Sequence, residues 1–280
     1  MPVDHGTLQS ITRYPIKSFQ GESVTSTLIQ AQGMYADRPL ALLDKSTGKV
    51  LSGKHARLGE RILGFSACYL SDPVPGQSLP EIRVSIDGEH FSSKDMKGLN
   101  QHCSEVLGTE VEIINAGGAP IDYETYWPEV EDLPLAGATM DFALPLAESG
   151  SFADLEPLHL LTTASLTHLA GLSPESNIDA ARFRPGLLLD CGDFNGFAEN
   201  DWVGRTATLG AMELEFTALA PRCIMTTRVQ QDLPKDPGIL KTLVQNNRHD
   251  YMGFSMPCLG IYAKVSSPGA VSVGDAFRLH

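Results

Sequence analysis

Residues 205–227 read RTATLGAMELEFTALAPRCIMTT, and no other stretch of the chain says more about its fold. Before Pro221, apolar and polar side chains alternate on both sides of Gly210, a pattern typical of two β-strands joined by a turn. Arg222 and Cys223 follow directly. The stretch therefore predicts a strand pair that carries a basic residue and a cysteine at its end.

Strand patterns recur through the rest of the chain, and helical patterns are few. Residues 23–31 and 38–44 are rich in strand-forming side chains. Asp87-Gly88 is a typical type I′ turn between two further strands. Helical spacing is found in three segments, 94–107, 160–172 and 237–250. We expect a mostly β protein of the α+β class, with a few helices on a barrel-like sheet.

Length and composition indicate a globular protein of about two domains. The chain has 280 residues, 42% of them apolar and 20% charged, so it can bury a sizeable core. It contains no run of about 18 apolar residues and no secretory signal, so we expect neither a membrane span nor membrane binding. Its five cysteines are dispersed without a CxxC pair, which fits a cytoplasmic location better than a disulfide framework.

Acidic residues are concentrated in one segment. The net charge is −13, yet residues 1–116 and 159–280 contribute only −2 each, whereas residues 117–158 hold nine acidic side chains and no Lys or Arg. We therefore expect a domain of residues 1–116 and a domain of residues 117–280 that begins with an acidic connector, 117–158. The connector is either a solvated linker or a docking surface for a basic protein. The negative charge argues against nucleic acid as a partner.

Common catalytic motifs are missing. The sequence contains no GxGxxG, GxxxxGK[ST], HExxH or GxSxG, and no histidine lies three or four residues from another. Basic residues instead occur beside Ser, Thr, Pro or Gly in four segments: Tyr14–Ser18, Ala36–Arg38, Arg182–Gly186 and Pro221–Thr227. Such side chains at strand ends can bind a phosphate. Arg222 favours the thiolate of Cys223, the form that binds metal, although spacing alone also permits a buried structural cysteine.

These segments, taken in order, resemble the MOSC superfamily, named after the C-terminal domain of molybdenum cofactor sulfurases. The matching features are YPIKS, ADR, FRPG, PRCIMTT and a late VGD. Similar members by pattern are two-domain proteins, among them amidoxime-reducing components and bacterial reductases of N-hydroxylated bases. The resemblance implies an N-terminal MOSC-type β-barrel domain followed by a C-terminal MOSC β-barrel domain with a few peripheral helices.

The resemblance also implies a cofactor. In the family, molybdenum held by a pterin, the molybdenum cofactor, takes a protein cysteine as a ligand, and this position falls on Cys223, which would be both metal ligand and catalytic residue. The positions of the family's other cofactor contacts fall on Lys17, Ser18, Arg38, Thr162, Thr163, Arg184 and Arg222. The two threonines could equally cap a helix. Arg222 could shape the pocket or pair with an acidic residue of the other domain. Pyridoxal phosphate is not expected.

The implied function is an oxidoreductase that reduces small N-hydroxylated compounds. The chain stops five residues after Asp275, so electrons would come from a separate ferredoxin- or flavoprotein-like reductase. Two segments depart from the family: its RCxxTTxDP reads RCIMTTRVQ here, and its TARQ-like segment reads SGKH at 52–55. The alternative is a sulfur-carrier or cofactor-handling protein with a persulfide on Cys223. A third possibility is a scaffold that only binds a protein through the acidic connector.

Overall fold

The computed structural model describes residues 4–117, 119–144 and 150–280. Strands account for 41% of the structure and helices for 19%, in agreement with the predicted mostly β fold. Gly118 and Glu148, both part of the predicted connector, lie outside the described residues. No helix in the described ranges has the length and apolar character needed to cross a membrane.

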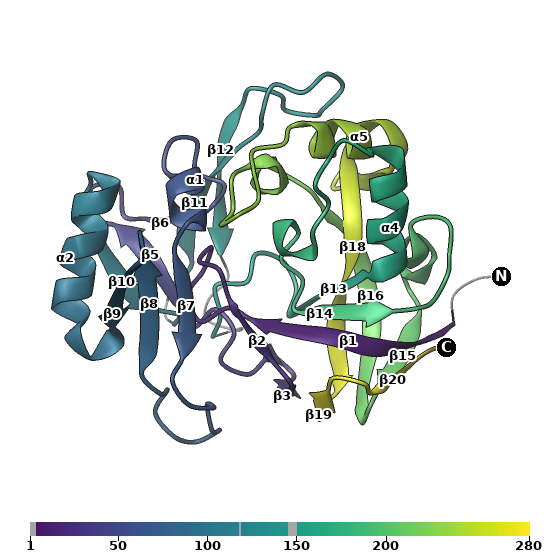
Figure 1. The fold of residues 1–280 in the computed structure, drawn as a ribbon, viewed down its shortest axis with the longest axis horizontal. Coiled ribbons are helices and arrows are strands. Elements are labelled where there is room, and N and C mark those ends of the chain that lie inside the picture. Colours follow the sequence, from purple (N-terminus) through teal and green to yellow (C-terminus); the bar gives the residue numbers. More distant parts are fainter. Residues whose placement is uncertain (1–3, 118, 145–149) are drawn as a thin grey trace.

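The larger unit is a closed barrel of seven strands, on the right of Figure 1. In ring order, the strands are β13 (Leu158–Thr162), β14 (Leu187–Asp190), β1 (His5–Arg13), β20 (Ala276–Leu279), β15 (Thr206–Leu209), β16 (Met212–Pro221) and β18 (Phe254–Ser267). Pairing of β13 with β18 closes the ring. The predicted strand pair around Gly210 is confirmed as β15 and β16. β1 belongs to this ring although it comes from the first part of the chain.

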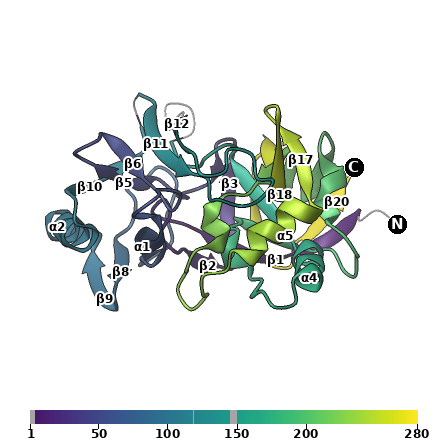
Figure 2. The same cartoon turned by 90° about the horizontal axis from the view of Figure 1, so that it is seen from above.

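Short elements surround the barrel. Two strands extend it, β2 (Glu22–Val24) beside β1 and β17 (Arg248–Tyr251) beside β18. Two helices pack on one side of it, α4 (Thr163–Leu172) and α5 (Gly238–Asn246) (Figures 1 and 2). A three-stranded sheet joins distant parts of the chain through β3 (Ser26–Gln30), β4 (Gly33–Met34) and β19 (Gly269–Ser272).

A five-stranded sheet forms the second unit. Its order is β10 (Val111–Asn115), β5 (Leu40–Asp44), β6 (Lys49–Leu51), β11 (Ile121–Tyr126) and β12 (Thr139–Leu144). The last two strands form a hairpin built from residues of the predicted connector. Part of that segment is thus paired with strands of the first part of the chain. The division of the chain at residue 116 stays a prediction.

A smaller sheet and two helices complete this unit. The sheet comprises β7 (Ser66–Tyr69), β8 (Ile82–Ile86) and β9 (Glu89–Ser92), and the helices are α1 (Gly59–Leu63) and α2 (Met96–Leu107). Asp87 and Gly88 have φ angles of 52° and 84°, which confirms the predicted type I′ turn between β8 and β9. α2 ends at Gly108, whose φ of 66° allows the left-handed conformation common after a helix.

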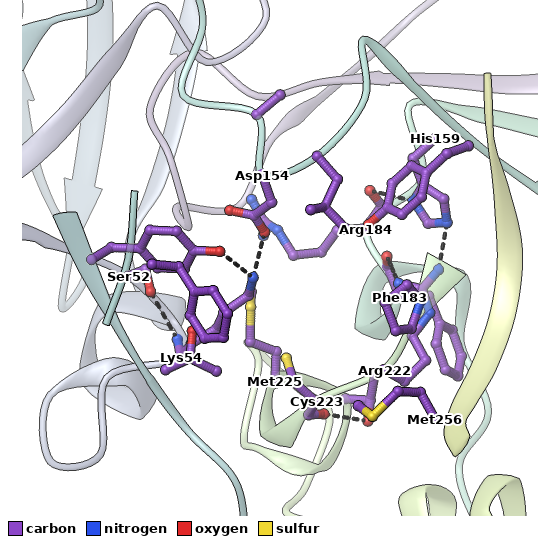
Figure 3. Close-up of a pocket in the computed structure, with 18 of the residues that line it drawn as sticks. Ser52, Lys54, Asp154, His159, Phe183, Arg184, Arg222, Cys223, Met225 and Met256 are labelled. Atoms are coloured by element: carbon purple, nitrogen blue, oxygen red, sulfur yellow. Dashed lines mark hydrogen bonds and ion pairs between the residues drawn. The ribbon is translucent and has the colours of Figure 1, made fainter. Parts of the chain in front are cut away.

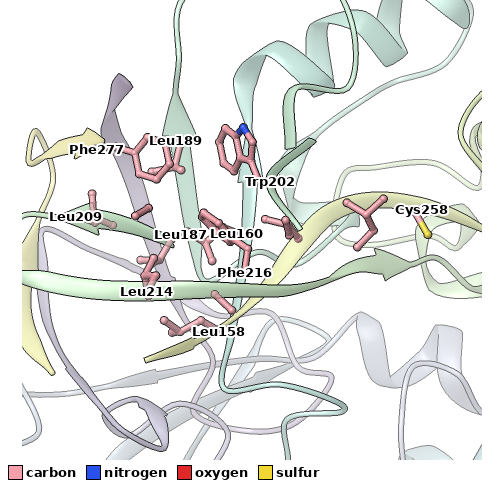
Figure 4. Packing of buried hydrophobic residues seen from close by; sticks show 14 of the residues in the cluster. Leu158, Leu160, Leu187, Leu189, Trp202, Leu209, Leu214, Phe216, Cys258 and Phe277 are labelled. Atoms are coloured by element: carbon pink, nitrogen blue, oxygen red, sulfur yellow. The ribbon is translucent and has the colours of Figure 1, made fainter. Parts of the chain in front are cut away.

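Each unit has its own hydrophobic core. In the barrel, the ring of Trp202 lies 5.3 Å from that of Phe216 and 5.1 Å from that of Phe277 (Figure 4). In the second unit, Phe19 packs edge-on against Phe65 at 5.3 Å. Burying each of these side chains stabilises the fold by about 2 kcal/mol. The barrel and the second unit are therefore each stabilised by a separate cluster of buried side chains.

Candidate functional site

A cavity of about 460 Å³ is lined by residues from both units. Its lysine and arginine residues come from the loops after β1, β4 and β6 and from the segments around β14 and β16: Lys17, Arg38, Lys54, Arg182, Arg184 and Arg222. Cys223 lies on the wall of the same cavity (Figure 3). A cavity of this size matches the usual range for small-molecule sites.

The structure brings together six of the eight residues predicted from the family resemblance. Lining the cavity are Lys17, Ser18, Arg38, Arg184, Arg222 and Cys223. Thr162 and Thr163 are not among the lining residues. The Thr162 hydroxyl accepts a hydrogen bond from the Ser165 amide at the start of α4 and donates to Glu199 at 2.8 Å. Thr163 faces a separate, shallower depression beside Asp190.

Three of these residues have a backbone conformation that is unfavourable for non-glycine residues. The φ angles of Ser18, Arg38 and Arg184 are 66°, 54° and 55°. Each such residue costs about 1–2 kcal/mol, which the surrounding structure has to offset. Part of the offset comes from short hydrogen bonds, such as that from the Arg38 amide to the Tyr14 carbonyl at 2.6 Å. Clustered strain of this kind is typical of functional sites, and it fixes where these side chains point.

Tyr14 lies between two of the arginines. The guanidinium carbon of Arg184 is 4.2 Å from the centre of the Tyr14 ring, and that of Arg38 is 4.5 Å from it. Arg38 also pairs with Asp37, which accepts a hydrogen bond from the Tyr14 amide. The ring and the carboxylate therefore permit two guanidinium groups to lie close together despite their like charge.

Arg184 has unused hydrogen-bonding capacity. Its Nη2 donates to the Phe19 carbonyl at 2.6 Å, but its Nη1 is buried and has no partner among the described residues. Burial lowers the pKa of Arg184 to about 10, so the group is still charged at neutral pH. A buried charged donor without an acceptor is costly, and an acceptor group bound in the cavity would remove that cost.

A half-buried carboxylate, that of Asp154, joins two lysines that line the cavity. Asp154 binds Lys54 at 2.7 Å through Oδ2 and accepts a hydrogen bond from Lys17 through Oδ1. Both ammonium groups also lie near the face of Tyr123, at 5.2 Å for Lys17 and 4.9 Å for Lys54. The cluster carries one net positive charge next to Cys223 (Figure 3).

The lysines respond differently to burial. Burial lowers the pKa of Lys17 to about 8, against the attraction of Asp154. Partial burial disfavours the charge of Lys54 as well, but its attraction to Asp154 and other groups raises its pKa well above the usual value. The pKa of Asp154 lies below its usual range because attraction to Lys17 and Lys54 outweighs the effect of burial. Lys17 is therefore the member of the cluster that changes charge first as the pH rises.

Binding of sulfate, an anion whose charge is constant over this range, to the cofactor-free protein is expected to weaken as the pH rises through about 8. Below this pH, protonated Lys17 attracts an anion, and above it the neutral amine does not. Calorimetric titrations on both sides of this pH test the expectation. Lys17→Met should remove the pH dependence, and the exposed control Lys45→Met should keep it. Equal affinity at every pH would show that Lys17 does not set the charge of the cavity.

Arg222 is held by acceptors of the barrel. Its Nε donates to the Leu259 carbonyl at 2.7 Å, and its Nη1 donates to the Phe183 carbonyl at 3.1 Å. Its Nη2 lies 2.5 Å from Nε2 of His159. In the described part of the chain it forms no ion pair, so the option in which Arg222 shapes the pocket agrees with the geometry.

His159 is a cavity residue that sequence reasoning missed. Burial, and then the charge of Arg222, hold the pKa of His159 well below its usual value, so the ring is neutral. Because Arg222 can only donate, Nε2 of His159 accepts, and Nδ1 carries the proton that it donates to the Arg184 carbonyl at 3.3 Å. The ring thereby links the two arginines and fixes their relative position.

Cys223 stands where a strand gives way to a tight turn. It follows the end of β16 and precedes the 3₁₀ helix Ile224–Thr227. The backbone carbonyl of Cys223 accepts a hydrogen bond from the Thr226 hydroxyl at 3.1 Å. The residue is half-buried and unpaired. A thiol at the wall of a cavity rich in basic side chains is suited to bind a soft metal that arrives with an anionic organic group.

Two family models match separate parts of this chain. The MOSC N-terminal beta barrel domain matches residues 5–58, and the MOSC domain matches residues 148–278. The chain belongs to the MOSC family, and its first part carries the N-terminal barrel domain of that family.

Named relatives extend over nearly the whole chain. Mitochondrial amidoxime reducing component 2 of Macaca fascicularis is 23% identical over 96% of this chain and 82% of its own length. The Bos taurus protein of the same name is 25% identical, with the same coverage. Among solved structures, the YuaD protein from Bacillus subtilis aligns over 99% of this chain and 96% of its own, with 10% identity and a TM-score of 0.44.

Proposed function

We propose that this protein is a molybdenum-cofactor-dependent reductase of N-hydroxylated compounds. The observation that carries the proposal is the convergence of the Cys223 thiol with six lysine and arginine residues in one cavity, where Arg184 has an unused buried N–H. Relatives named amidoxime-reducing components support the reaction class.

The residues of the cavity fit an anionic pterin whose metal takes a thiolate ligand. Cys223 would bind the metal as a thiolate, and Lys17, Ser18, Arg38 and Arg184 would bind the phosphate and the polar edges of the pterin. When bound, this cofactor would supply two-electron reduction of the N–O bond. Arg222 and neutral His159 would keep the floor of the cavity in place. Thr162 lies away from the cavity, and its part would be to cap α4.

The overall reaction consumes two electrons and two protons. The N–O bond of the substrate breaks, its oxygen leaves as water, and the N-hydroxylated group becomes the corresponding amine or amidine. We infer that the electrons come from a separate ferredoxin- or flavoprotein-like reductase. A cytoplasmic location stays a prediction.

Molybdenum content tests the proposal directly. We expect the isolated protein to contain stoichiometric molybdenum and to reduce hydroxylaminopurine with a reducing partner. Cys223→Ala should lose the metal because it removes the sulfur ligand and leaves no other ligand atom in its place. The control Cys68→Ala changes another half-buried cysteine, on β7, and should retain the metal.

The sulfur-carrier alternative predicts a different result. In that case, intact mass spectrometry would find one additional sulfur atom, located on Cys223, and elemental analysis would find no molybdenum. A protein with neither metal nor persulfide, and without activity towards hydroxylaminopurine, would contradict both functions.

A further inference from the structure

The hairpin between β17 and β18 has an unusual tip. Tyr251 pairs with Phe254, which leaves Met252 and Gly253 as a two-residue loop. Their φ angles of 53° and 83° define a type I′ turn, in which Asn, Asp or Gly is preferred at the first position. Methionine is unfavourable there, and its side chain is 82% exposed. The needs of the turn therefore do not explain this residue.

The tip belongs to the cavity of the candidate site. Tyr251, Met252 and Phe254 all line it, and Phe254 is also exposed. These residues are part of the barrel unit. The tip thus places three large side chains at the edge of a site whose interior is basic.

The five-stranded sheet contributes matching apolar residues. Met140 and Phe142 of β12 line the same cavity and are exposed, as is Leu155. β12 and β17 lie on the same, upper side of the molecule in Figure 2. Five of the twelve exposed large hydrophobic residues in the described ranges thus line this one cavity. Exposed apolar residues that gather in this way mark a binding surface.

The apolar residues are continuous with the basic ones. The ring of Phe142 lies 6.0 Å from that of Tyr123, whose face is in turn next to Lys17 and Lys54. A ligand could therefore contact apolar side chains with one end while its polar end reaches the charged interior. Because the apolar residues come from both units around a cavity of small-molecule size, they form a slot rather than a flat docking face.

We propose that these residues bind the apolar body of the substrate, with Met252 as a main determinant. The inference rests on the proposed reductase function and specifies its substrate class: N-hydroxylated compounds with an aromatic or long alkyl group. Methionine suits this task because its flexible side chain adapts to apolar groups of different shapes.

Met252→Asn tests the proposal without weakening the hairpin, since Asn is favoured at this turn position. KM values for benzamidoxime, which has an aromatic ring, and for hydroxylamine, which has no apolar group, are compared using a chemical electron donor. We expect the KM for benzamidoxime to rise about fivefold relative to that for hydroxylamine, as when roughly 40 Å² of apolar contact is lost. Leu70→Asn, an exposed control outside the cavity, should leave the ratio unchanged.

A binding measurement separates this inference from the proposed function. Benzamidoxime binding is measured by calorimetry in the Cys223→Ala background, with and without Met252→Asn, and the second change should weaken it by a similar factor. If the wild-type protein reduces neither compound but tip-dependent binding persists, the reductase function fails and the apolar site stands. An unchanged ratio and unchanged binding would overturn the inference. So would an effect confined to the KM for a protein electron donor.

Discussion

Replacing Glu199 by alanine is expected to lower the free energy of unfolding by about 4 kcal/mol. The side chain is completely buried and accepts three hydrogen bonds, from the hydroxyls of Thr162 and Ser165 and from the Gly260 amide at 2.8 Å. Without the carboxylate, three buried donors lose their acceptor and a cavity is left.

Urea denaturation of Glu199→Ala beside Glu215→Ala measures this effect. Glu215 is exposed on β16, so its replacement should change stability by less than about 0.5 kcal/mol. If Glu199→Ala lowers the free energy of unfolding no more than Glu215→Ala does, the buried donors find other acceptors.

Replacing Glu199 should also affect how Arg222 is positioned in the candidate site. Gly260 has a φ of 81°, and a Cβ at this position would approach Nε2 of His159 to 2.6 Å. The neighbouring Leu259 carbonyl accepts the hydrogen bond from Arg222. Glu199 therefore fixes the backbone segment that positions Arg222, although it does not line the cavity itself.

Asp154→Ala is the second change with a large expected effect, and it should lower the free energy of unfolding by about 3 kcal/mol at neutral pH. It removes the half-buried carboxylate that compensates the ammonium groups of buried Lys17 and half-buried Lys54. Burial of two like charges without a counterion is unfavourable, and the pKa of Lys17 should then fall below its present value of about 8.

The stabilising contribution of Asp154 is expected to change with pH in a defined direction. Because the pKa of Asp154 is lowered in the folded protein, its stabilising contribution is present above the unfolded pKa of about 3.9 and disappears as the pH falls below it. The wild-type protein should therefore lose its advantage over Asp154→Ala in acid. At alkaline pH, deprotonation of Lys17 should narrow the difference as well.

Urea denaturation across this pH range measures the difference, with Asp141→Ala as control. Asp141 also pairs with a lysine, Lys49 at 2.6 Å, but the pair is exposed, so about 0–1 kcal/mol is expected. If Asp154→Ala and Asp141→Ala lower the free energy of unfolding equally, Lys17 and Lys54 do not need Asp154 to compensate their charge.

Local features of the fold could be predicted from the sequence. The alternation around Gly210 and the Asp87-Gly88 pair both correspond to hairpins in the structure, because strand periodicity and turn residues act over a few neighbours. The place of β1 in the barrel could not be predicted in this way. Its pairing with β14 and β20 joins residues far apart in sequence, and no local pattern encodes such partners.

The candidate site could be predicted only in part, and the reason is similar. Motif resemblance indicated Arg184 and Cys223, which do meet in the cavity. It also indicated Thr162, because a hydroxyl at a helix start looks the same whether it binds an anion or caps the helix. Asp154 was one of nine acidic residues in its segment, and its position between two lysines distinguishes it. Lys17 and Lys54 lie 137 and 100 positions earlier in the chain, and no local sequence pattern encodes such partners.

The position of β1 has a consequence for how the chain folds during synthesis. Its neighbour β20 is made last of the barrel strands, and His5 pairs with Arg278. The ribosome must therefore release nearly the entire described chain before the ring can close, and the nascent β1 stays without this neighbour until then. Contacts of such long sequence separation slow folding. The segment matched by the MOSC domain, residues 148–278, would therefore lack one strand of its barrel, β1, if it were made alone.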